Sequence, residues 1–139
     1  MPKLSNEEIQ MINLLELNTG ARANDVVLTD GAVVFIVQEG DLGKAIGKKG
    51  SNILRLKKIL DRGVEVVEDS SNLKQFLKNI FYPVEIKEIT TNEADDVKSI
   101  TLQVDPENKG LAIGRGGEKI ERARILVKRH FGYGKLRIL

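Results

Sequence analysis

The sequence predicts an α+β protein made of two copies of one small unit, each with a three-stranded sheet packed by helices. Three observations lead to this prediction. A nine-residue phrase occurs twice, as AIGKKGSNI over 45–53 and as AIGRGGEKI over 112–120, and matched positions lie 67 residues apart. Strand-like alternation precedes both phrases, and helical spacing follows both. A repeat at a fixed offset of about half the chain indicates that one supersecondary unit was used twice.

The first copy is expected to run helix, strand, strand, helix, loop, helix, strand. Ser5 to Glu8 has the spacing of a capping box and predicts the start of the first helix. Asp30-Gly31 is the strongest hairpin signal in the chain. The expected elements are a helix over 6–17, strands over 26–29 and 32–38, a short helix over 42–46, a longer helix over 50–61 and a strand over 64–68.

The second copy is expected to repeat this order. Its elements are a helix over 72–80, strands over 84–90 and 97–104, a short helix opened by Asp105-Pro106, a helix over 117–130 and a strand over 135–139. The strand turn is expected in the acidic stretch 93–96. Six residues share the apolar face of the two long helices and are predicted to be core: Ile53, Leu56, Leu60, Ile120, Ala123 and Val127. We therefore expect domains at residues 1–70 and 71–139, with cap residues at 69–72 instead of a free linker.

Length and composition limit the possibilities. Each copy has about 70 residues, near the lower limit for independent folding, so we expect the copies to be joined closely. The chain has no cysteine and one histidine, and no metal or other cofactor is expected. Its apolar runs are shorter than the ~20 residues of a membrane span, and the start of the chain lacks an apolar signal region. The protein is expected to be cytoplasmic, with no membrane partner, and monomeric.

Positive charge gathers around the two repeated phrases, although the formal net charge is only +2. Residues 43–60 contain six basic residues and no acidic one. Residues 109–129 contain seven basic residues against Glu118 and Glu121. Such local concentration is typical of a site for a polyanion, although a solvated helix face gives similar counts.

Both phrases place Gly-x-x-Gly between two helices. We expect the first glycine to take the left-handed conformation that ends a helix, and the second to admit close approach because it lacks a Cβ. Unsatisfied amides at the start of the following helix would favour a phosphate. Between the glycines, Lys48, Lys49 and Arg115 would hold or steer the anion. An apolar floor is expected beside the loops from four isoleucines: Ile46, Ile53, Ile113 and Ile120.

The phrase Ile-Gly-x-x-Gly-x-x-Ile between helices resembles the KH domain, and the leading helix and strand resemble its type II topology. Two such units in tandem are similar to archaeal NusA-type transcription termination and antitermination factors. The resemblance implies that Gly47 to Gly50 and Gly114 to Gly117 contact the backbone of single-stranded RNA, with about four nucleotides in each groove. The resemblance also implies RNA polymerase as a candidate protein partner. The expected RNA-binding residues are Gly43, Lys44, Ile46, Gly47, Lys48, Lys49, Gly50, Arg55, Ile113, Gly114, Arg115, Gly116, Gly117, Lys119 and Arg122.

The glycine-rich loops do not have the spacing of a nucleotide-binding enzyme. A P-loop needs Gly, four residues, then Gly-Lys-Ser/Thr, but Lys49 follows Gly47-Lys48 and Leu42 occupies the first glycine position. Neither this pattern nor a dinucleotide fingerprint is present, so no catalytic activity is expected. His130, near a helix end, is expected to be a surface or capping residue. The carboxylates Asp95-Asp96 are expected to lie in a solvated hairpin turn, where adjacent side chains diverge and no partner base or metal ligand accompanies them. A KH protein of the ribosome or of RNA processing, and a KH pair that binds proteins, remain alternatives.

Overall fold

The structure is a computed structural model that describes residues 4–29 and 31–139. The chain divides into two compact units between Ser71 and Asn72. They are called here the N-terminal unit and the C-terminal unit, and each is described by itself. Among the described residues, no helix has both the length and the apolar character needed to cross a membrane.

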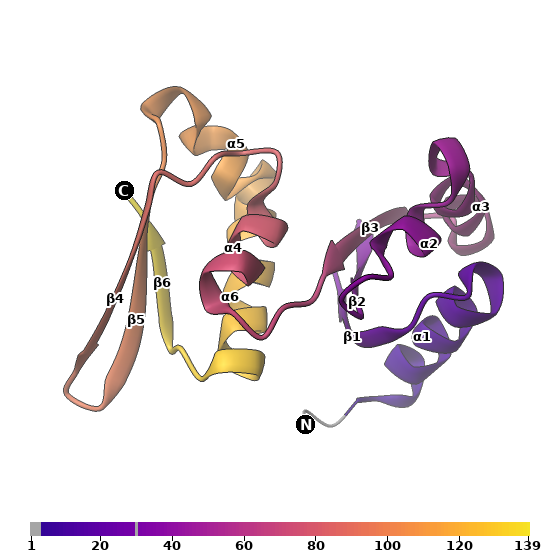
Figure 1. Ribbon diagram of the computed structural model, residues 1–139, viewed down its shortest axis with the longest axis horizontal. Helices are drawn as coiled ribbons and strands as arrows, with labels where there is room; N and C mark the ends of the chain where they lie inside the picture. Colours follow the sequence, from indigo (N-terminus) through magenta and orange to yellow (C-terminus); the bar gives the residue numbers. More distant parts are fainter. Residues whose placement is uncertain (1–3, 30) are drawn as a thin grey trace. The chain divides into compact units, whose positions relative to one another are not determined.

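The N-terminal unit follows the expected order of elements. These are α1 (Asn6–Thr19), β1 (Ala23–Leu28), β2 (Ala32–Val37), α2 (Leu42–Ile46), the 3₁₀ turn η1 (Lys48–Gly50), α3 (Ser51–Leu60) and β3 (Gly63–Glu68). The sheet has the order β1-β2-β3, with β1 antiparallel and β3 parallel to β2. The parallel pair requires a crossover between β2 and β3. This crossover carries α2 and α3, which lie with α1 on one face of the sheet (Figure 1).

Helix α1 begins at the predicted capping box. The Glu8 backbone N–H donates to Ser5 Oγ at 3.2 Å, and the Ser5 N–H donates to Glu8 Oε1 at 2.9 Å. The helix runs two residues past the predicted end and stops at Gly20, whose φ is 77°. The predicted turn at Asp30-Gly31 includes residue 30, which lies outside the described residues. The strands on either side pair in register from Leu28 with Val33.

The core of the N-terminal unit lies between its sheet and its helices. Leu15 of α1, Phe35 of β2 and Leu56 of α3 are fully buried there. Ile53 and Leu60 pack against this cluster while remaining partly exposed. The predicted apolar face of α3 is therefore confirmed. All six residues of β2 are buried, so both faces of this central strand are covered.

The C-terminal unit repeats the same order. Its elements are α4 (Leu73–Phe81), β4 (Glu88–Ala94), β5 (Val97–Gln103), the 3₁₀ turn η2 (Pro106–Asn108), α5 (Lys109–Ile113), the 3₁₀ turn η3 (Arg115–Gly117), α6 (Glu118–Phe131) and β6 (Lys135–Ile138). The sheet has the order β4-β5-β6, again antiparallel and then parallel. Its helices lie on one face (Figure 1). Ile120, Ala123 and Val127 of α6 are buried, as predicted.

The first strand of this unit lies further along the chain than predicted. Residues 84–87 were expected to be strand, but β4 begins only at Glu88. The Val84 N–H donates to the Phe81 carbonyl at 2.8 Å in a turn after α4, so this N–H is not paired with a neighbouring strand. The predicted start of this strand was therefore wrong, because Val84 is a buried residue of a turn and a buried apolar residue occurs in turns as well as in strands.

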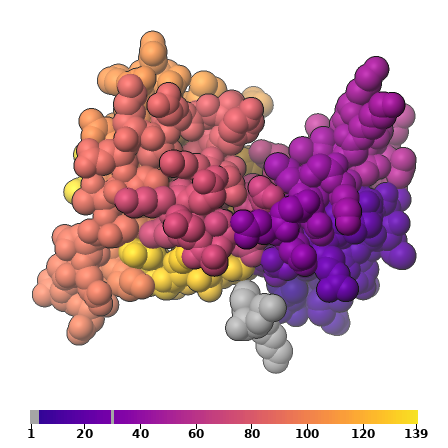
Figure 2. Space-filling model, viewed as in Figure 1, coloured from indigo at the N-terminus to yellow at the C-terminus, as the bar shows by residue number. Residues whose placement is uncertain are grey.

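The hairpin turn is also tighter than predicted. Glu93 pairs with Lys98 and Ala94 with Val97, so these acidic-stretch residues belong to the ladder. Only Asp95 and Asp96 form the turn, with φ of 53° and 62°. Two successive residues at positive φ are typical of the two-residue hairpin turn whose twist matches the strands. The hairpin end projects from the body of its unit (Figure 2).

Candidate nucleic-acid interface

The two Gly-x-x-Gly loops have nearly the same backbone. The first loop is Gly47 to Gly50, between α2 and α3, and the second loop is Gly114 to Gly117, between α5 and α6. The leading glycines have φ/ψ of 76°/171° and 82°/170°. The closing glycines have 75°/14° and 78°/10°. The sequence repeat is therefore also a repeat of one unusual loop conformation.

The leading glycine of each loop is required for two reasons. Its positive φ with ψ near 170° is a conformation that is essentially confined to glycine. A Cβ on Gly47 would also lie 2.7 Å from Asn52 Cγ, and a Cβ on Gly114 would lie 2.7 Å from Lys119 Cβ. The prediction of a left-handed helical conformation at the first glycine was wrong. Its backbone is extended at positive φ instead, and the first turn of the next helix packs directly against it.

The left-handed conformation occurs instead at the closing glycine. Gly50 and Gly117 lie in this region, and a Cβ there would meet nothing within 4 Å. The residue before each closing glycine is left-handed too, with φ of 56° at Lys49 and 63° at Gly116. Each loop thus offers an uncrowded backbone surface next to a helix start.

The helix starts beside the loops lack side-chain caps. No side chain accepts a hydrogen bond as an N-cap at Gly50 or Gly117. The 3₁₀ turn itself uses some donors, since the Gly50 N–H donates to the Gly47 carbonyl at 3.1 Å and the Ser51 N–H to the Lys48 carbonyl. The expectation that the first amides are all unsatisfied was wrong for these groups. The positive end of the helix dipole remains at each loop.

The charged side chains within and before the loops are accessible. Lys44, Lys48, Lys49 and Arg115 are exposed. None of them pairs with an acidic side chain in the part of the chain that the structure describes, where ion pairs join Lys87 to Asp105 and Arg124 to Glu121 instead. These four cations lie next to the loop backbone and are available to an anion. The exposed Gly43 and Gly116 add uncovered backbone.

Three other predicted site residues serve the fold. Arg55 Nη1 donates to the Asn18 carbonyl at 3.2 Å, and Lys119 Nζ donates to the Tyr82 carbonyl at 3.3 Å. Both carbonyls lie at the C-terminal end of the unit's first helix, where cations are favourable. Arg122 is only 8% exposed. Helical spacing showed these residues near the loops but not that their side chains turn toward the protein.

The isoleucines expected to form an apolar floor separate into two groups. Ile46 and Ile113 are half-buried beside the loops. Ile53 packs against the core cluster, and Ile120 is 8% exposed, so both mainly serve the core. Sequence reasoning missed Leu111, which is 66% exposed on α5 at the position equivalent to Lys44. The second loop is therefore less charged and more apolar than the first.

Asn52 is a second residue that the sequence analysis missed. Its side-chain amide donates to the Lys44 carbonyl at 2.8 Å and so joins the start of α3 to α2. The signal in the sequence was an asparagine two residues after the closing glycine. In the described residues, no group of three His, Asp or Glu side chains is placed to hold a metal ion.

Comparison with known proteins agrees with this geometry. A family model described as "KH domain" matches residues 11–94, from α1 of the N-terminal unit to β4 of the C-terminal unit. The chain is 34% identical to the "Probable transcription termination protein NusA" of Methanococcus vannielii, over 99% of this chain and 79% of the relative. It is 38% identical to the protein of the same name from Halobacterium salinarum, over 93% of this chain and 92% of the relative.

A solved structure gives the same picture. The crystal structure of APE1850 is 36% identical in sequence, with a TM-score of 0.85 that covers 98% of this chain and 100% of that chain. The chain therefore belongs to the KH domain family and, within it, to the family of archaeal NusA proteins.

Proposed function

We propose that the chain consists of two tandem type II KH domains, residues 1–70 and 71–139, that bind single-stranded RNA and modulate transcription termination or antitermination. The observation that carries this proposal is the shared backbone of the two loops, each with a glycine whose φ is positive beside a crowded helix start. The archaeal relatives named probable transcription termination protein NusA support the transcription role.

The loops bind the sugar-phosphate backbone in this proposal. A phosphate approaches the open closing glycine, where no Cβ blocks it, and meets the positive end of the helix dipole. Lys48 and Lys49 at the first loop, and Arg115 at the second, supply charge-assisted hydrogen bonds. Ile46 and Ile113 provide half-buried apolar surface beside the clamped backbone, against which bases turn. No step of this mechanism is catalytic.

Two loops in one chain increase the apparent affinity. Once one loop holds the strand, the other meets its segment of the same RNA at a high effective concentration. Two modest sites then bind tightly without any further contact. The proposed place of action is the cytoplasm, on nascent transcripts, and RNA polymerase is the protein partner that such a role suggests.

The test is the double substitution Lys48→Asp with Lys49→Asp. Both side chains are exposed, and aspartate tolerates the left-handed conformation of Lys49, so the fold should persist. Lys57→Glu with Lys58→Glu is the matched control, because it changes the charge equally at the far end of α3. We expect the loop variant to bind single-stranded RNA at least tenfold more weakly than the control. For the wild type, the logarithm of the binding constant should fall linearly with the logarithm of the salt concentration, with a slope of about 0.7 for each phosphate contacted.

Two results would contradict the proposal. Equal RNA affinity in the loop variant and the control would remove the loops from the binding site. Wild-type affinity that does not change with salt would exclude a phosphate clamp. Sequencing of RNA crosslinked to the protein in cells would then separate a role in transcription from one in ribosomes or RNA processing.

A further inference from the structure

The C-terminal sheet has a second face that its helices do not cover (Figure 1). Ile100, Leu102 and Leu136 are buried, and the residues between them along the strands point to the opposite face. We call this opposite face the open sheet face. Its central part is formed by six polar residues: Thr90, Asn92, Ser99, Thr101, Lys135 and Arg137. The pairs Glu88 with Gln103 and Ala94 with Val97 lie on the same face, beyond the two ends of this central part.

These residues form two rows across the three strands. Asn92 pairs with Ser99, which pairs with Lys135. Thr90 pairs with Thr101, which pairs with Arg137. The rows line an open depression of about 660 Å³. In each row, neutral hydrogen-bonding groups lie on β4 and β5, and a cation lies on the edge strand β6.

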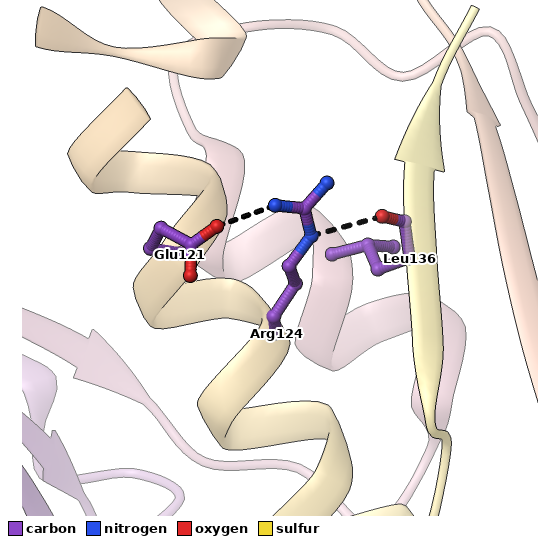
Figure 3. A network of polar contacts seen from close by, with 3 residues as sticks. All are labelled: Glu121, Arg124 and Leu136. Carbon is purple, nitrogen blue, oxygen red and sulfur yellow. Dashed lines mark hydrogen bonds and ion pairs between the residues drawn. The ribbon is translucent and has the colours of Figure 1, made fainter. Parts of the chain in front are cut away.

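The depression is positively charged. The residues that line it, all in the described part of the chain, include Arg124, Lys135 and Arg137 but no aspartate or glutamate. Arg124 reaches from α6 to donate to the Leu136 carbonyl at 3.1 Å, and Glu121 pairs with its guanidinium (Figure 3). Its charge is thereby compensated. The other two cations of the depression, Lys135 and Arg137, are both exposed, and Arg137 Nε donates to Thr101 Oγ1 at 3.2 Å.

The fold itself does not require this polar set. At the equivalent positions of the first repeat, Ser99 and Thr101 are replaced by Ala32 and Val34, and both are buried. Gly63 and Glu65 of β3 stand where the second repeat has Lys135 and Arg137, as the strand pairing shows. Both basic residues are therefore special to the C-terminal unit.

We infer that the open sheet face binds a further segment of the same single-stranded RNA, which rests on the RNA binding proposed above. Lys135 and Arg137 lie two residues apart on one strand, roughly 6.6 Å, a spacing at which they would contact neighbouring phosphates of an extended chain. The hydroxyl groups of Thr90, Ser99 and Thr101 would form hydrogen bonds with ribose hydroxyls and base edges, either as donors or as acceptors. No aromatic residue lines the depression, so binding depends on charge and hydrogen bonds instead of stacking.

The experiment is an RNA titration of the full chain with Lys135→Gln and Arg137→Gln together. Lys74→Gln with Lys78→Gln is the matched control, because these exposed lysines of α4 change the charge equally away from the sheet. With a long single-stranded RNA, we expect the sheet variant to bind roughly tenfold more weakly and its salt slope to fall by about 1.4. With RNAs of four nucleotides, which fill only one loop groove, wild type and sheet variant should show equal affinity at the loops.

A second measurement does not depend on the variant. In an NMR titration of the wild-type chain with long RNA, the amides of Ser99, Thr101 and Arg137 should shift, in addition to those of the two loops. If the sheet amides do not shift, or if the sheet variant and its control bind long RNA equally, the inference is wrong while loop binding stands. If RNA shifts neither the loops nor the sheet, the proposed function fails as well.

Discussion

A β-carbon at Gly47 would lie 2.7 Å from Asn52 Cγ, closer than folded proteins allow. Asn52 is held in that position by its hydrogen bond to the Lys44 carbonyl at 2.8 Å. The end of α2 and the start of α3 can therefore pack this closely only because Gly47 has no side chain. This contact fixes the direction in which the loop backbone faces, and it recurs at Gly114 and Lys119.

Gly47→Ala should destabilise the N-terminal unit by about 2–4 kcal/mol, because it adds backbone strain at positive φ to a steric clash. Gly43→Ala is the control. Gly43 lies in α2, and a Cβ there would meet nothing within 4 Å. Alanine at that position should leave stability unchanged or raise it by up to about 1 kcal/mol. Urea unfolding measures both, and similar midpoints for the two variants would show that the close packing at Gly47 is unimportant.

The loops differ at the residue before the closing glycine, which is Lys49 in the first and Gly116 in the second. Lys49 adds a positive charge to the first loop but has a left-handed conformation, which destabilises the fold by roughly 1–2 kcal/mol for a residue with a Cβ. Gly116→Lys should therefore lower the free energy of unfolding by about 1 kcal/mol and increase the salt slope of RNA binding by about 0.7. Lys49→Gly should produce the reverse of both changes. Opposite signs in either measurement would count against the shared loop geometry.

Arg122 and Arg55 occupy equivalent positions in the repeat but differ in burial. Arg122 is 8% exposed, whereas Arg55 is exposed and donates to the Asn18 carbonyl. Arg122→Ala should cost about 2–4 kcal/mol, because it removes the packing of a buried side chain together with its interactions. Arg55→Ala should cost about 1 kcal/mol or less. Thermal unfolding of the two variants compares them directly, and a smaller loss at Arg122 would contradict the structural role assigned to it.

Ser5→Ala removes the side-chain acceptor of the capping box at α1. The Glu8 N–H then loses its partner, and the cost should be about 1 kcal/mol. Ser51→Ala is a suitable control, because Ser51 is the first residue of α3 and this helix start has no side-chain cap hydrogen bond. Its substitution should be neutral or slightly stabilising. Equal losses at both serines, measured by urea unfolding, would mean that the reciprocal cap contributes nothing.

Local signals predicted much of the fold. The short helix Leu42–Ile46 has the bounds read from the sequence, and the capping box at Ser5 is formed as expected. These features depend on neighbours in the chain, so residue type and spacing contain the required information. The strand start near Val84 was wrong, because its N–H forms a turn with Phe81 that apolar alternation does not reveal.

Within the candidate site, the loops were found from the repeat, but the roles of the residues around them were not. Lys48, Lys49 and Arg115 are exposed where charge clustering placed them. Lys119 and Arg122 carry the same charge, yet one donates to the carbonyl of Tyr82 and the other is buried. Composition counts a cation without showing whether its side chain turns toward water or toward the protein.

The sequence by itself determined that one unit occurs twice and that each copy carries a Gly-x-x-Gly segment between helices, because a repeat and a helical period can both be read from the order of residues along the chain. Tertiary structure alone decided which glycine is crowded, which basic side chains stay accessible, and that Lys135 and Arg137 join the rows of Ser99 and Thr101. Those outcomes depend on contacts between segments far apart in the chain, which form only when the sheet pairs and the helices pack.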